Sequence, residues 1–196
     1  LDVQESGIEV HLNTVVTKEM LEEIKPDALI VAIGSSPFVL PIEGSEKAIV
    51  AHDVLSEKVE VPGENVVIIG GGLVGFETAE FLAARQKKVT VLEMKEKALQ
   101  DLGPLRQITA QFAMAQMPIT IETSATVERI EDHAVVASGK EYPYDSVIMA
   151  VGSKANDTSI YTDLGIPTYI IGDCKKAGIA LDAFKDAYHA VLEINK

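Results

Sequence analysis

Hydrophobic positions along the chain gather into short apolar runs separated by helical patterns, which predicts an α/β protein. Continuous apolar runs are typical of parallel strands that are buried on both faces. A glycine at the end of such a strand allows the backbone to pass close to a ligand. Three runs stop in this way, at 28–33 before Gly34, at 66–69 before Gly70, and at 147–151 before Gly152.

The middle of the chain alternates between helix and strand patterns. An apolar face with helical spacing predicts a helix over 76–86, and Lys88–Glu93 predicts the next strand. Pro104 is placed to begin another helix, which continues to Gln116. Four short β-like runs follow, at 119–123, 125–131, 134–138 and 140–144, and they predict a strand followed by a small antiparallel meander.

Both chain ends hold further elements. The stretch 8–17 alternates and is rich in β-formers, and Thr17 is predicted to cap a short helix that ends at Lys25-Pro26. Near the C-terminus a strand over 166–171 precedes an amphipathic helix over 177–194. Together the patterns predict a Rossmann-like doubly wound parallel sheet with an antiparallel β-meander. They also predict a second, incomplete α/β unit formed by the two chain ends.

A glycine-rich turn follows the central strand and fits the pattern G-x-G-x-x-G. Gly70 permits a tight turn, Gly72 lets a pyrophosphate approach the backbone, and Gly75 lets the next helix pack close to the strand. The N-terminus of that helix offers free N–H groups and a partial positive charge to phosphates. Strand, turn, helix, strand and acid occur in the order of a dinucleotide fingerprint. The alternative is a glycine turn in a βαβ unit that binds no ligand.

The acid of this fingerprint is Glu93, which lies 18 residues after Gly75. A carboxylate there accepts hydrogen bonds from both ribose hydroxyls of an adenosine and repels a 2′-phosphate. The sequence therefore favours NADH over NADPH. Lys95 and Lys97 follow closely and weaken that preference.

Two segments of the chain repeat one pattern. Asp27–Ser35 and Asp145–Ser153 share Asp, Ile, Ala, Gly and Ser at matching offsets, but only the second has a glycine loop upstream. We therefore expect the chain to begin inside a domain, with an NAD(P)-binding domain at 63–154 and a partial second domain at 1–62 and 155–196. The alternative is convergence of two parallel strands on a similar composition.

Composition and charge exclude several classes of function. The formal net charge of −13 over 196 residues argues against nucleic acid or an anionic membrane as a partner. A single cysteine, Cys174, excludes a disulfide framework or paired redox cysteines, and its packing as a small residue is favoured over a reactive thiol. The sequence shows no metal-binding spacing, membrane-length apolar run or signal peptide, so a cytoplasmic location is expected.

The segments Gly70–Met94 and Ile171–Asp182 resemble a known family. They are similar to the C-terminal part of the multidomain NADH:flavin oxidoreductases, the 2-enoate reductase and 2,4-dienoyl-CoA reductase group related to Old Yellow Enzyme. The resemblance implies an N-terminal barrel with FMN and an iron–sulfur cluster, both outside this sequence. It also implies an FAD domain that is interrupted by an NAD(P) domain, so that 1–62 and 155–196 would hold only part of the FAD site.

The resemblance also implies roles for single residues. The residues that would wrap the NADH pyrophosphate are Gly70, Gly71, Gly72, Leu73, Val74 and Gly75. Glu93 and Met94 would flank the adenosine ribose, and Gly152 would lie against the cofactor. Glu77 would lie near the nicotinamide carboxamide, or it is simply a charge in the first helical turn. Asp173, after Gly172, would bind the flavin ribitol, or it caps a turn.

The resemblance implies hydride transfer from NADH to FAD, followed by reduction of an activated C=C bond at FMN in the missing barrel. No side chain of this chain need act as an acid or base, because the cofactors carry the chemistry. The chain alone is expected not to be catalytically competent. Two alternatives remain open: a stand-alone NAD-binding or sensing module without redox activity, and a structural domain whose glycine loop is empty.

Overall fold

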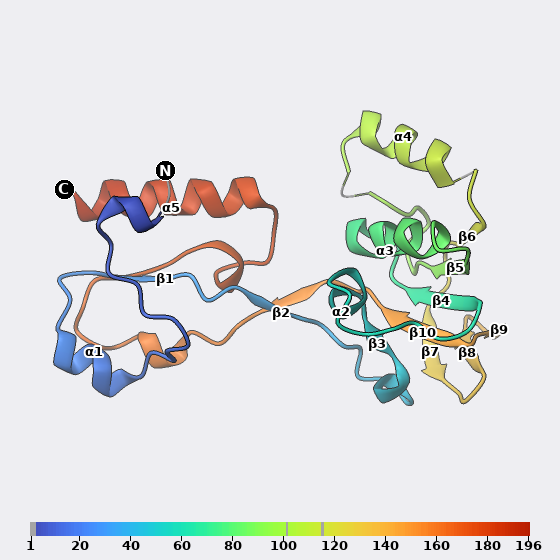
Figure 1. Cartoon of the computed structure of the whole chain (residues 1–196), viewed down its shortest axis with the longest axis horizontal. Helices are drawn as coiled ribbons and strands as arrows, with labels where there is room; N and C mark the ends of the chain where they lie inside the picture. The colour runs from blue at the N-terminus through green and yellow to red at the C-terminus, as the bar shows by residue number, and fades with distance from the viewer. Residues whose placement is uncertain (1–2, 101, 115) are drawn as a thin grey trace. The chain divides into compact units, whose positions relative to one another are not determined.

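The computed structural model describes residues 3–100, 102–114 and 116–196. The chain divides into two compact units, each with its own elements (Figure 1). Unit 1 consists of Leu1–Ser35 and Ala155–Lys196, and unit 2 consists of Ser36–Lys154. Where the chain crosses between the units, β2 (Ser35–Pro37) pairs with β11 (Ser153–Ala155).

Unit 2 is built on a five-stranded parallel sheet with the strand order β3-β10-β4-β5-β6. Its strands are β3 (Ile49–Val50), β10 (Ser146–Met149), β4 (Asn65–Ile69), β5 (Lys88–Leu92) and β6 (Ile119–Glu122). The register aligns Ile69 with Met149 on one side and with Leu92 on the other, so these strands end at one edge of the sheet. The continuous apolar runs of β4 and β10 fit a sheet that is buried on both faces.

Helices cover one face of this sheet. α2 (Ala51–Leu55) and α3 (Leu73–Ala83) bury Val54, Ala79 and Leu82 against Ile68 and its neighbours in one core cluster. α4 (Pro104–Met114) packs through Met114 in a smaller cluster. Full burial of such an aliphatic side chain contributes about 1.5–3 kcal/mol to stability.

The other face is covered by the antiparallel meander. Its strands are β7 (Val127–Ile130), β8 (Ala134–Ala137) and β9 (Lys140–Pro143), in that spatial order. Ile130 and Val135 from the meander share a core cluster with Val67, Ile69 and Val147 of the parallel sheet. The predicted fold class, a Rossmann-like parallel sheet with a β-meander, is confirmed.

Unit 1 holds a two-stranded parallel sheet of β1 (Leu29–Val31) and β12 (Thr168–Ile170). Its helices are α1 (Lys18–Ile24) and α5 (Ala180–Ile194), and short 3-10 turns cover Val3–Ser6, Ser159–Tyr161 and Gly172–Cys174. The predicted cap of α1 is confirmed, because the Thr17 hydroxyl accepts from the Met20 amide at 3.4 Å. Cys174 is buried, as its predicted role in packing requires.

Two expectations differ from the structure. The stretch 8–17 forms no strand, because no neighbouring strand offers it hydrogen bonds among the described residues of unit 1. The change of unit occurs after Ser35 rather than near residue 62. The segment 36–62 belongs to unit 2 because β3 pairs with β10 and α2 packs in the core of that unit. The same segment contains the 3-10 turn Ser45–Lys47. The assignment of one cofactor to each unit stays a prediction.

Candidate dinucleotide-binding site

The turn between β4 and α3 begins at a glycine that no other residue could replace. Gly70 has φ +108°, and a Cβ there would lie 2.4 Å from the carbonyl oxygen of Ala150. Its amide donates to the carbonyl of Leu92 at 2.8 Å. The backbone therefore turns sharply while it stays bonded to the neighbouring strand β5.

The last glycine of the turn serves helix packing. A Cβ on Gly75 would lie 1.9 Å from the carbonyl oxygen of Gly70. Such a contact is far shorter than any real Cβ makes, so α3 can lie this close to the end of β4 only with glycine at this position. The structure thus shows the tight turn that was predicted at Gly70 and the close packing of helix on strand that was predicted at Gly75.

The middle glycine faces open space. No atom lies within 4 Å of a Cβ built on Gly72, and its φ of −78° is accessible to other residues. Gly72 is the N-cap of α3 and provides no side chain to cap the helix. The first amides of a helix lack partners within it and carry partial positive charge. The structure therefore presents a helix N-terminus without a side-chain cap, with open space beside Gly72, and helix N-termini of this kind favour anions.

Glu93 is held against this turn by both oxygens of its carboxylate. Oε2 accepts from the Gly71 amide at 2.8 Å, and Oε1 accepts from the Lys95 amide at 2.8 Å. The side chain is only 8% exposed. The sequence predicted Glu93 as a ribose acceptor, and the structure gives it a second task, to fix the glycine turn to the end of β5. A carboxylate oxygen has more than one lone pair, so these bonds leave acceptor capacity for a ligand.

A segment that the sequence analysis did not single out supports the same turn. The Leu99 amide donates to the Gly71 carbonyl at 2.9 Å, and the Leu99 side chain is buried beside Phe76. Gln107 from α4 donates its side-chain amide to the Leu99 carbonyl at 3.0 Å. The apolar pair Ala98-Leu99 within a charged loop was the signal that could have revealed this contact.

The other candidate residues of unit 2 surround the same edge of the sheet. Gly152 follows β10, next to the end of β4, and its carbonyl accepts from the Phe38 amide at 2.9 Å. Glu77 is half-buried in α3. Met94 is 68% exposed just after Glu93. Leu73 and Val74 begin α3.

The candidates in unit 1 gather at the ends of its two strands. Gly34 follows β1 and Gly172 follows β12, and the two strands are parallel neighbours. Asp173 accepts from the Ser35 hydroxyl at 3.3 Å and from the Gly178 amide at 3.2 Å. These contacts match the turn-capping alternative for Asp173 and leave its role toward a flavin a prediction.

An acidic residue of α5 reaches the same turn. The Gly172 amide donates to Asp186 at 3.2 Å, and Lys175 pairs with the other oxygen of that carboxylate. The hydrogen bond from Lys175, together with that from Gly172, holds the pKa of Asp186 below its usual value. Asp186 was missed in the sequence because its partners lie 11 and 14 residues away, in a turn whose shape no local pattern predicts.

A parallel sheet, a glycine turn and an uncapped helix define a dinucleotide-binding protein of the Rossmann type. The sequence profile of the pyridine nucleotide-disulphide oxidoreductases matches residues 2–183. The chain therefore belongs to the pyridine nucleotide-disulphide oxidoreductase family and has the FAD- and NAD(P)-binding fold of that family.

Individual relatives extend this assignment. The chain is 35% identical over 202 residues to a cinnamate reductase of Clostridium sporogenes, with 98% of this chain and 30% of the relative covered. It is 32% identical over 206 residues to an NADH oxidase of Thermoanaerobacter brockii, with 98% and 32% covered. A solved 2-naphthoyl-CoA reductase in complex with 2-naphthoyl-CoA superposes with a TM-score of 0.84 at 32% identity, over 95% of this chain and 30% of that one.

The chain thus spans about 30% of the length of these relatives. Within the described ranges, no helix is both long and apolar enough to cross a membrane. In the same part of the chain, no three His, Cys, Asp or Glu side chains are grouped so that they could hold a metal ion.

Proposed function

We propose that unit 2 binds NADH through the turn after β4, and that the chain is the dinucleotide-binding region of an NADH:flavin oxidoreductase. The observation that carries this proposal is the open approach to Gly72 at the N-terminus of α3. The backbone amides from Gly72 to Gly75 would hold the pyrophosphate, since helix N-termini bind anions of this kind.

Glu93 would select the nucleotide. Its carboxylate is fixed in place by the amides of Gly71 and Lys95, so it cannot turn away from a bulky anion at little cost. A ribose with free hydroxyls would donate to it, whereas a 2′-phosphate would meet a negative charge. We therefore infer a preference for NADH over NADPH. Met94, exposed beside it, would contact the adenosine.

In the proposed reaction, the redox chemistry would be supplied by bound FAD, which would take a hydride from NADH. The residues of this chain bind and orient, and none of them has to move a proton. Gly152 and Glu77 would lie along the nicotinamide half of NADH. FAD would be contacted in unit 1 by Gly34, Gly172 and Asp173. The sheet of unit 1 has two strands, whereas that of unit 2 has five.

The final acceptor would be an activated C=C bond, in an enoate or dienoyl-CoA, reduced at an FMN barrel that also carries an iron–sulfur cluster and lies outside this sequence. The names of the cinnamate reductase and the 2-naphthoyl-CoA reductase support this substrate class, because both describe reductases of unsaturated carboxylic acid derivatives.

Equilibrium dialysis of the chain against NADH, NADPH and FAD separately tests the proposal. We expect one NADH per chain, weaker NADPH, and FAD weaker than NADH because unit 1 would hold only part of its site. Absence of NADH binding would contradict the site in unit 2. Tight stoichiometric FAD binding would contradict the partial character of unit 1.

A further inference from the structure

The peptide between Gly71 and Gly72 sets the direction of one amide at the N-terminus of α3. It is a trans peptide, so the N–H of Gly72 is directed opposite to the C=O of Gly71. A half-turn of this peptide would carry the φ of Gly72 from −78° into the positive region, which glycine accepts at no steric cost. The glycine that leaves room for a ligand therefore also lets its amide rotate away, unless another contact holds the peptide.

That contact comes from the loop between β5 and α4. The Leu99 amide donates to the Gly71 carbonyl at 2.9 Å, which directs the N–H of Gly72 away from the loop. The amide of Gly71 itself is held separately, by Oε2 of Glu93 at 2.8 Å. Two successive peptides of the turn thus have two different anchors, Glu93 for the peptide before Gly71 and Leu99 for the peptide after it.

Leu99 has a backbone conformation that needs support. Its φ is +59°, in the left-handed region that is unfavourable for a residue with a Cβ. Such conformations persist where the surrounding contacts over-determine them. The Leu99 side chain is only 3% exposed and lies in a core cluster with Phe76 and Ala110. The Leu102 amide donates to the Leu99 carbonyl at 3.1 Å, so the loop also closes on itself at this residue.

Gln107 of α4 supplies the remaining support. Its Nε2 donates to the carbonyl of Leu99 at 3.0 Å and to the carbonyl of Leu102 at 2.8 Å. A side-chain amide has two N–H groups, so one glutamine can serve both acceptors. A chain of hydrogen bonds therefore runs from α4 through Leu99 to the peptide that presents the Gly72 amide.

We propose that Gln107 is a positioning residue for the pyrophosphate of NADH. It acts through Leu99, prevents rotation of the Gly71–Gly72 peptide and keeps the Gly72 amide directed at the ligand. The inference rests on the proposed binding of NADH at this turn. Because NADH and NADPH share the pyrophosphate, Gln107 affects the affinity for both equally, whereas Glu93 affects the choice between them.

Three variants of the 196-residue chain test this role. Gln107→Met keeps the length of the side chain and removes both N–H donors, whereas Gln107→Lys restores donors that can serve both carbonyls. Gln116→Met, the same change at an exposed glutamine after α4, is the control. In Gln107→Met, the dissociation constants of NADH and NADPH should rise by the same factor, at least about tenfold. They should return to within about threefold of the natural values in Gln107→Lys and stay unchanged in Gln116→Met.

NMR of the chain without nucleotide gives a second readout that does not depend on binding. In the natural chain the Gly72 amide should give a single sharp resonance. In Gln107→Met, relaxation dispersion should show exchange at Gly72 and Leu99 on the microsecond-to-millisecond timescale, and Gln107→Lys should abolish it. A glutamine that only stabilises the fold would lower the melting temperature when replaced, without exchange confined to these two amides.

Several results would overturn the proposal. These are a Gln107→Met chain that folds and binds both nucleotides as before, a Gln107→Lys chain that binds as weakly as Gln107→Met, or exchange at Gly72 in the natural chain. If Gln107→Met does not fold, Gln107→Glu takes its place, because glutamate keeps the length and also lacks the donors. If the natural chain binds no NADH, the proposed function is contradicted, and the exchange measurement alone decides whether Gln107 holds the peptide.

Discussion

At the scale of single residues, the three glycines of the turn after β4 meet different constraints. Gly70 and Gly75 are required by contacts within the protein, because a Cβ on either would meet a carbonyl oxygen at 2.4 Å or less. Gly72 meets nothing within 4 Å. Folding therefore explains two of the glycines, and the third is left to be explained by a ligand that approaches the backbone.

Two substitutions distinguish a glycine that folding requires from one that a ligand requires. Gly72→Ala should keep or slightly raise the melting temperature, since its φ of −78° suits alanine, while it lowers NADH affinity at least about tenfold by filling the approach. Gly75→Ala should destabilise the fold by about 1–3 kcal/mol or more, because α3 must move away from β4. Thermal unfolding and NADH titration of both variants are the measurements. An unchanged NADH affinity of Gly72→Ala would exclude the proposed role of this residue.

Glu93 links the glycine turn to nucleotide choice. In Glu93→Gln an NH₂ group replaces one of the two oxygens that accept the Gly71 and Lys95 amides, which should cost about 1–3 kcal/mol of unfolding free energy. The same change removes the negative charge, so the NADPH affinity should rise relative to NADH. Denaturant unfolding and competition between the two nucleotides measure both effects. Glu96→Gln, in the exposed loop nearby, is the control, and equal behaviour of the two variants would contradict this account.

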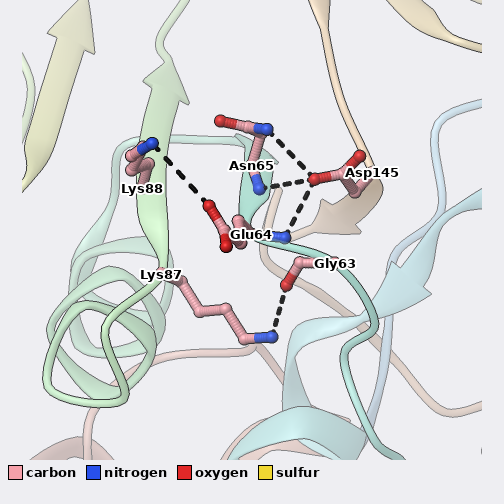
Figure 2. A network of polar contacts seen from close by, with 6 residues as sticks. All are labelled: Gly63, Glu64, Asn65, Lys87, Lys88 and Asp145. Carbon is pink, nitrogen blue, oxygen red and sulfur yellow. Dashed lines mark hydrogen bonds and ion pairs between the residues drawn. The ribbon is translucent and has the colours of Figure 1, made fainter.

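At the scale of elements, the start of β4 is held by a carboxylate whose charge matters. Hydrogen bonds from Asn65 and Glu64 hold the pKa of Asp145 below its usual value. The stabilisation is therefore fully present above the unfolded pKa of about 3.9 and is lost as the pH falls through the lower folded pKa. Figure 2 shows Lys87 bonded to Gly63 beside this network, so the segment before β4 is fastened from two sides.

The lowered pKa of Asp145 predicts how the difference in melting temperature between the natural chain and Asp145→Asn depends on pH. It should be largest near pH 7 and should shrink below about pH 4, where the aspartate becomes protonated in the unfolded chain. Melting curves from pH 7 to pH 2.5 measure it, with Asp163→Asn as a matched control. A difference that stays constant over this range would show that the charge of Asp145 has no part in holding β4.

Elements whose pattern is local and strong could be predicted from the sequence. The run 66–69, the glycine turn and the strand at Lys88 lie within one residue of β4, the turn and β5. The stretch 8–17 was predicted as β-rich and forms no strand, because a strand exists only where a partner strand offers hydrogen bonds. The amphipathic pattern of α5 is real, yet Phe184 is 74% exposed, since the pattern gives a helix but not what covers it.

The candidate site could be predicted only in part. The fingerprint gave the turn, the acid and their spacing, because each of these follows from local sequence. The bond from the Gly71 amide to Glu93, and that from the Leu99 amide to the Gly71 carbonyl, depend on how distant segments meet. Likewise, the boundary near residue 35 depends on the pairing of β3 with β10.

At the scale of the whole molecule, the chain consists of two units whose sheets differ in size. Unit 2 has a five-stranded sheet with helices on one face and a meander on the other, whereas the sheet of unit 1 has two strands in the described residues. The apolar side chains that are exposed on unit 1 include Ile30 in β1 and Phe184 in α5. Stability should therefore reside mainly in unit 2.

Because most of the core lies in unit 2, we expect this unit to fold and to bind NADH without unit 1. A chain of Ser36–Lys154 alone should fold cooperatively, because its core clusters draw on this unit alone. It should bind NADH within about threefold of the whole chain, since every proposed contact to NADH lies in it. Circular dichroism melting and NADH titration measure both. Loss of NADH binding in a well-folded unit 2 would show that unit 1 contributes to the site.

The central claim is that the main-chain amides after Ile69 form an anion-binding turn with the N-terminus of α3. The most direct measurement is an NADH titration of the 196-residue chain followed amide by amide by NMR. The account predicts saturable shifts that are largest for the amides of Gly71 to Gly75, and none comparable at β12 in unit 1. Saturation with those amides unmoved, or no binding of NADH at all, would contradict it.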